Sequence, residues 1–131
     1  MENTLTDCCD RCIVGKLIAN NLGETSDDRL KFNETPIINA SQIIKQLNPV
    51  VYDKSKVLNV EEDTFKEAGL IAQEVLNTDI SFCVTGGDYT DFFGNKIEHP
   101  YDVNYNSILA YLISGFQEQQ KLIEELIAHI K

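Results

Sequence analysis

Residues 106–131, NSILAYLISGFQEQQKLIEELIAHIK, carry the strongest periodic pattern in the chain. Apolar side chains recur there at steps of three and four, as in a coiled-coil heptad. The a and d positions are Leu109, Leu112, Phe116, Gln119, Ile123, Leu126 and Ile130, and Leu122 and Ile127 widen the stripe. A wide stripe with Ile and Phe at a favours three or more helices over two, and Gln119 should cost stability but help fix the register. The alternative is a helix that packs on its own domain.

The chain has 131 residues, which predicts a single domain. Hydrophobic residues make up 43% of it, so it should be globular. Eleven basic residues against 21 acidic ones give a net charge of −10. This charge argues against nucleic-acid binding, because phosphate backbones would be repelled. No stretch is apolar enough for a membrane span, and no signal peptide is visible.

Four cysteines stand at positions 8, 9, 12 and 83. Cys9-x-x-Cys12, with Cys8 beside it, is compatible with a zinc site or a redox pair. The other possible ligands, which are Cys83, His99 and His129, are scattered along the sequence. We therefore expect free thiols in a reducing compartment and no metal.

Upstream of the heptads, the pattern of short segments predicts an α+β fold. Residues 1–12 are expected to be a frayed or partner-dependent tail, 13–19 a strand and 20–23 a turn. A short helix capped by Asn39 or Ser41 should bury Ile43, Ile44 and Leu47 and end at Asn48–Pro49. Further strands are expected at 50–52, 81–84 and 101–105, a polar surface excursion at 53–66, a helical turn at 73–76, and turns at 86–87 and 94–95.

The segment Ser26-Asp27-Asp28-Arg29-Leu30-Lys31 places a serine five residues before a lysine. A serine becomes a nucleophile when a neutral amine takes its proton, and Ser–Lys pairs are a known variant of the Ser-His-Asp arrangement. A lysine does this only when burial or a neighbouring cation, here Arg29, lowers its pKa. Neither a helix nor a strand brings such a pair together, so the segment must bend or the pair must form between chains. The alternative is a solvated turn with Thr25 or Ser26 as a helix cap.

Several motifs, taken in order, resemble the C-terminal intramolecular chaperone domain of phage endosialidase tail spikes, which other phage fibre proteins and the myelin regulatory factor share. That family opens with Ser-Asp-x-Arg-x-Lys-x-Asn, which residues 26–33 match. A Pro-Ile pair (36–37), Leu-x-Pro-Val-x-Tyr (47–52) and Gly-Leu-Ile-Ala-Gln-Glu-Val (69–75) follow. Val-x-Tyr-x-x-Ile at 103–108 precedes the long helix.

The resemblance implies a homotrimer that helps the upstream stalk of its own chain to fold and then cuts itself at Thr25–Ser26. Ser26 would be the nucleophile and Lys31 its base, as in an autocatalytic serine endopeptidase that acts once and needs no cofactor. Asp27, Arg29 and Asn33 would support the site, and Arg29 or backbone N–H groups would stabilise the oxyanion. Gln73, Glu74 and Tyr105 match positions with structural roles.

On this view, residues 1–25 are the released end of the stalk. Residues 26–131 are the chaperone domain, with its coiled-coil helix at about 106–131. The parent protein would be a tail fibre or tail spike of a virus, assembled in the host cytoplasm. Two alternatives stay open: a trimerisation module that does not cleave, and an α+β interaction domain whose acidic surface binds a basic partner.

Overall fold

The computed structural model describes residues 24–131, and these fall into two units, 24–35 and 36–131. The predicted tail, the strand at 13–19, the turn at 20–23 and Cys8, Cys9 and Cys12 lie outside the described residues. Within the described part of the chain, no helix is both long enough and apolar enough to cross a membrane. Residues 36–131 form the α-helices and the strands, and residues 24–35 contain the candidate site.

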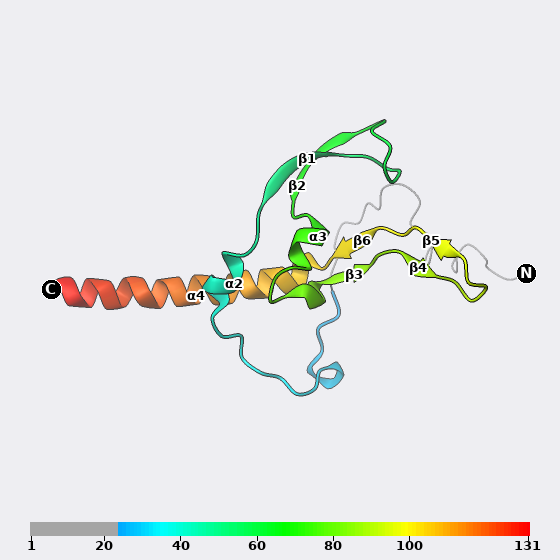
Figure 1. Ribbon diagram of the computed structural model, residues 1–131. Coiled ribbons are helices and arrows are strands. Elements are labelled where there is room, and N and C mark those ends of the chain that lie inside the picture. The colour runs from blue at the N-terminus through cyan, green and yellow to red at the C-terminus, as the bar shows by residue number, and fades with distance from the viewer. Residues whose placement is uncertain (1–23) are drawn as a thin grey trace, which may run out of the picture. The chain divides into compact units, whose positions relative to one another are not determined.

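The longest element is α4, Tyr105–Ile130, which confirms the predicted C-terminal helix (Figure 1). It begins at Asn104, whose side-chain oxygen accepts a hydrogen bond from the Ser107 N–H at 3.1 Å. This interaction satisfies one of the N–H groups that the first turn of any helix leaves unpaired. The fold is α+β, with short strands and short helices preceding one long helix.

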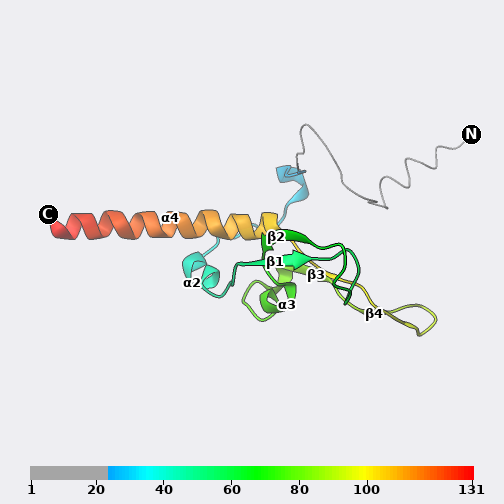
Figure 2. The same ribbon diagram turned by 90° about the horizontal axis from the view of Figure 1, so that it is seen from above.

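Helix α2, Ala40–Ile44, lies against the middle of α4 in both views (Figures 1 and 2). The close approach depends on Gly115, which is buried in α4. A Cβ atom at this position would lie 2.8 Å from Cδ1 of Ile44. Ala40 is fully buried, while Ile43, Ile44 and Leu47, predicted to be the core of this helix, are only half-buried.

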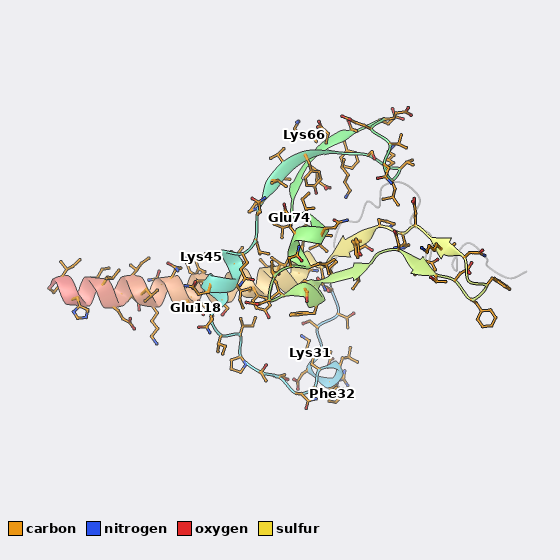
Figure 3. The ribbon with its side chains drawn as sticks, viewed as in Figure 1. Lys31, Phe32, Lys45, Lys66, Glu74 and Glu118 are labelled. Atoms are coloured by element: carbon orange, nitrogen blue, oxygen red, sulfur yellow. The ribbon has the colours of Figure 1, made fainter. Side chains whose placement is uncertain are left out.

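The predicted cap of α2 is wrong. Asn39 occupies the N-cap position, but it has a left-handed backbone with φ of 56° and its side chain makes no capping hydrogen bond. Glu118 of α4 supplies the cap instead: Oε1 accepts from the Ala40 N–H, and Oε2 accepts from the Ser41 N–H, both at 2.8 Å. Oε2 also accepts from the Ser41 hydroxyl at 2.7 Å, and Figure 3 shows Glu118 beside α2. One carboxylate thus joins the two helices.

Strands β1, Val50–Lys54, and β2, Phe65–Gly69, form an antiparallel hairpin that arches away from α4 in Figure 1. Their register pairs Val50 with Gly69 and Lys54 with Phe65. The strand predicted at 50–52 is confirmed and is longer than expected. Residues 53–66, predicted to be a surface excursion, lie at the surface, but the prediction did not foresee that their two ends pair in the hairpin.

After α3, Ala72–Val75, the chain makes a 3₁₀ turn, η2, at Ser81–Cys83. The prediction of a strand at 81–84 is therefore wrong for its first three residues. A long ribbon follows: β3 (Val84–Gly86) pairs with β6 (Tyr101–Val103), and β4 (Tyr89–Thr90) pairs with β5 (Lys96–Ile97). Gly87 has φ of +95°, and a Cβ there would lie 2.3 Å from the Tyr101 ring, so only glycine fits this bend.

The hydrophobic core of the described residues is small. Its fully buried apolar side chains are Ala40, Val75, Ile80 and Cys83. Many large apolar side chains are exposed, and those on α4 include Phe116 at 70% and Leu126 at 61%. A single chain therefore leaves much of its apolar surface in contact with water.

Glu118→Gln should make the protein less stable at neutral pH and flatten its loss of stability in acid. Hydrogen bonds from Ser41 and Ala40 hold the pKa of Glu118 below its ordinary value. Its contribution is therefore complete above about pH 4.3, the pKa of an unfolded glutamate, and is lost as the pH falls through the lower folded value. Thermal unfolding from pH 7 to pH 3 measures this, with Glu125→Gln as the control on the same helix. Equal acid sensitivity in both variants would contradict the role assigned to Glu118.

Candidate functional site

The Ser26–Lys31 segment is bent by a short 3₁₀ turn, η1, at Asp28–Leu30. Asp27 is the N-cap residue: its Oδ1 accepts a hydrogen bond from the Arg29 N–H at 2.8 Å. The backbone closes the turn through Leu30 N–H to Asp27 C=O at 3.1 Å and Lys31 N–H to Asp28 C=O at 3.0 Å. The cap is therefore Asp27, and neither Thr25 nor Ser26 has the predicted capping role.

The Arg29 guanidinium lies against the Asp27 carboxylate in a two-pronged ion pair. Nε donates to Oδ1 and Nη2 donates to Oδ2, each at 3.0 Å. The side-chain hydrogen bond from Arg29 is the main reason that the pKa of Asp27 lies below its usual value. This pairing fixes the shape of the turn and directs the positive charge of Arg29 toward Asp27.

The bend brings the two candidate catalytic groups together within one chain. Nζ of Lys31 donates a hydrogen bond to Oγ of Ser26 at 2.5 Å. The sequence argument left open whether the pair forms within a chain or between chains, and here the 3₁₀ turn brings the side chains together within one chain. The two side chains are thus within reach of each other, which a nucleophile and its base must be.

The whole segment is open to solvent. Residues 24–35, including Ser26 and Lys31, are all exposed in the single chain. The apolar neighbours Leu30 and Phe32 are 65% and 79% exposed. Figure 3 shows Lys31 and Phe32 on this segment. Asn33, the last residue of the motif, has a left-handed backbone with φ of 56° and turns the chain as it leaves the site.

A second group of motif residues meets around Gly69, at the base of the β1–β2 hairpin. A Cβ on Gly69 would lie 2.6 Å from the Tyr105 hydroxyl oxygen and 2.9 Å from that of Tyr52. Tyr105 accepts a hydrogen bond from the Leu70 N–H at 2.9 Å. Tyr52 donates to Glu67 at 2.5 Å, which raises the pKa of Tyr52 to about 12. These tyrosines anchor the hairpin, and Tyr105 has the structural role expected from the sequence.

The same region contains an open hollow of about 640 Å³, lined mainly by β1, β2 and the residues from Glu98 to Tyr105. Three of its polar side chains pair with one another, because Glu67 accepts from Tyr52 and forms an ion pair with Lys54. Within residues 24–131, no three His, Cys, Asp or Glu side chains gather closely enough to hold a metal ion. Cys83 is a free, buried thiol whose pKa is raised by its burial.

Residues 26–80 match the model of the Peptidase S74 family, the chaperone of endosialidase. The matched stretch begins at Ser26 and contains the motifs at 26–33, 36–37, 47–52 and 69–75. The match confirms the resemblance inferred from the motifs and supports an intramolecular chaperone role, and the family name marks the domain as peptidase-related. No curated protein matches the chain.

Some important contacts of the described residues could not be foreseen from the sequence. The cap from Glu118 to α2 joins residues more than seventy positions apart. No local pattern marks Glu118, since an acidic residue on a helix surface is ordinary. The Tyr105–Leu70 hydrogen bond had an indirect signal, because both residues belong to family motifs. That signal identified the residues without indicating that they touch.

Tyr105→Phe should loosen the attachment of the β1–β2 hairpin without unfolding α4. The substitution removes the hydroxyl that accepts from the Leu70 N–H. Hydrogen–deuterium exchange should then be faster at Leu70 and across β2 and unchanged in the middle of α4. Tyr111→Phe, on the same helix, is the matched control. Unchanged exchange at Leu70 would show that the hydroxyl does not hold the hairpin.

Proposed function

We propose that this domain trimerises, assists the folding of the chain upstream of it, and then cuts the Thr25–Ser26 bond with the Ser26–Lys31 dyad. The observation that carries the proposal is the contact between Lys31 Nζ and Ser26 Oγ at the first residue of the family match. The parent protein would be a viral tail fibre or tail spike that assembles in the host cytoplasm. The folding client is the upstream stalk of the same chain.

The reaction begins with neutral Lys31 removing the proton from the Ser26 hydroxyl. Oγ attacks the carbonyl carbon of Thr25, and a C–O bond forms as the C–N bond to the Ser26 nitrogen breaks. Lys31 returns the proton to that nitrogen, which leaves as a free amine while Thr25 is held as an ester. Water then hydrolyses the ester, which restores the Ser26 hydroxyl and releases Thr25 as a carboxylate. Asp27 and Arg29 act here as positioning residues that maintain the turn.

Assembly of several chains would bury the Lys31 amine, which is exposed in a single chain. A lysine acts as a base in its neutral form, and burial is the usual cause of the necessary fall in pKa. Ser26, Lys31 and the apolar residues Leu30 and Phe32 are all exposed in one chain. Covering this segment with neighbouring copies would bury the amine and activate the dyad. Cleavage would then follow assembly and would not precede it.

The exposed stripe on α4 supports trimerisation. Its a and d side chains point to solvent, with Leu109 at 51%, Leu112 at 54% and Ile123 at 49% exposure. Beyond Glu118 every residue of the helix is exposed. A free helix of only a few turns is marginal in water, so this part requires a partner for its stability. Three copies would cover the stripe with one another.

A trimer at this position also explains how the domain would act as a chaperone. Three stalk strands that must intertwine lose conformational entropy before their contacts form, so folding is slow. Joining the chains through α4 raises the local concentration of each strand for the other two. Cutting afterwards removes the nucleating domain and leaves the stalk kinetically trapped.

The second candidate is a trimerisation module whose dyad is unused. It is favoured by the full exposure of the Ser26–Lys31 segment, which leaves the lysine solvated in a single chain. The two candidates share the same fold and oligomer and differ only in whether the Thr25–Ser26 bond is cut.

Intact mass spectrometry of freshly purified protein separates these candidates. The wild type should split into residues 1–25 and 26–131, whereas Ser26→Ala and Lys31→Ala should stay whole, because each lacks one partner of the proton transfer. A wild-type chain that stays whole but is trimeric by light scattering would support the unused dyad and reject the cleavage reaction.

Phe116→Glu should abolish both trimer formation and cleavage. The ring is 70% exposed on the apolar stripe, and a buried charge in each chain would oppose its closure. Gln117→Glu, on a neighbouring exposed position outside the stripe, should leave both properties unchanged. Light scattering gives the oligomeric state, and intact mass gives the cut fraction. Complete cleavage in monomeric Phe116→Glu protein would reject the dependence on assembly.

A further inference from the structure

Helix α4 has two distinct faces. One face packs within the domain: Gly115 is buried against Ile44, and Glu118 caps α2. On a helical projection the a and d stripe lies roughly 120° away from this face. The stripe is therefore free to pair with other helices while α2 stays in place.

The residues beside the stripe carry no pattern of charges with which a partner helix could form ion pairs. Coiled coils usually select orientation and register through oppositely charged side chains at the e and g positions. In α4 the e positions are Ile113, Gln120 and Ile127, and the g positions are Ile108, Gly115, Leu122 and His129. None is an acid, a lysine or an arginine, so ion pairs across the seam cannot set the alignment. Gln120 is also engaged on its own helix, where it donates to Glu124 at 3.1 Å.

Gln119 is the polar exception within the stripe. The other a and d positions from Leu109 to Ile130 are all apolar. A glutamine amide has an NH₂ group that donates hydrogen bonds and a carbonyl oxygen that accepts them, and burying it without partners is costly. A single buried amide in such a seam can specify register and oligomeric state at a cost in stability.

We propose that Gln119 is the residue that aligns the copies of α4, by forming a hydrogen-bonded layer of three amides in a parallel, in-register seam. In this alignment each amide meets the other two at the same level of the trimer. A slip of one heptad places Gln119 against Leu112 or Leu126, and an antiparallel partner places it against Phe116 or Ile123. Each alternative leaves amides unpaired among apolar side chains. The inference rests on the trimer of the proposed function and adds what determines its geometry.

The test uses the full chain with Ser26→Ala, which keeps every molecule whole. In this background Gln119→Leu should raise the melting temperature, because an apolar layer replaces a polar one. It should also lose the single trimer, giving a mixture of oligomers by native mass spectrometry. Gln119→Asn, which keeps an amide, should retain the single trimer. Gln117→Leu makes the same chemical change outside the stripe and should change neither property.

A second measurement reports alignment directly. A pyrene label on Lys131→Cys, with Cys8, Cys9 and Cys12 replaced by Ser, brings three labels together only when the helices are parallel and in register. The Ser26→Ala protein should show excimer emission, and Gln119→Leu should lose much of it at the same protein concentration. Cys83 is buried, so labelling it in the folded protein is disfavoured.

The possible failures are distinguishable. A trimeric parent in which Gln119→Leu keeps one oligomer and full excimer emission overturns the role of Gln119 and leaves the trimer intact. A monomeric parent without excimer emission overturns the trimer, and the role of Gln119 with it.

Discussion

The contact between α2 and α4 fixes the arrangement of residues 36–131. Gly115 lets the two helices approach, and the Glu118 carboxylate joins them by accepting hydrogen bonds from the N–H groups of Ala40 and Ser41. Because α2 leads directly toward β1, this contact also sets where the β1–β2 hairpin begins. The Tyr105 hydroxyl then holds the base of the hairpin at Leu70. Within residues 36–131, α4 therefore contacts α2, the base of the β1–β2 hairpin and η2, and the stripe between Leu109 and Ile130 is left uncovered.

The exposed stripe on α4 and the small core both show that a single chain buries little of its apolar surface. Four fully buried apolar side chains are few for the residues that the structure describes, whereas many large apolar side chains are exposed, both along α4 and on the elements that precede it. In most single domains these proportions would be reversed. This pattern supports the proposed trimer, in which contact between copies would supply the burial that a single chain lacks.

The elements that could be predicted were those determined by the residues within them. The heptad repeat determined α4 almost to the residue, and the β-branched pair Val50–Val51 marked β1. The strand predicted at 81–84 was wrong for its first three residues, because Ser81, Phe82 and Cys83 form a 3₁₀ turn that packs against α4. The cap of α2 was missed for a similar reason: Asn39 has the right side chain, but its left-handed backbone points it away. At the candidate site, the spacing of Ser26 and Lys31 excluded regular structure and required a bend. It did not reveal that Asp27 and Arg29 would form that bend.

The Ser26–Lys31 contact lies early in the chain, whereas the stripe on α4 lies near its end. Because synthesis runs from the N-terminus, the ribosome makes the nucleophile and its base long before it makes the helix that would join three chains. Under the proposal that assembly activates the dyad, a chain interrupted during translation has a complete Ser–Lys pair but no means of burying it. Its upstream segment would stay attached, so the interrupted chain could be degraded as one molecule. The order of the two features along the sequence would thus restrict the release of finished stalks to chains that were translated through α4.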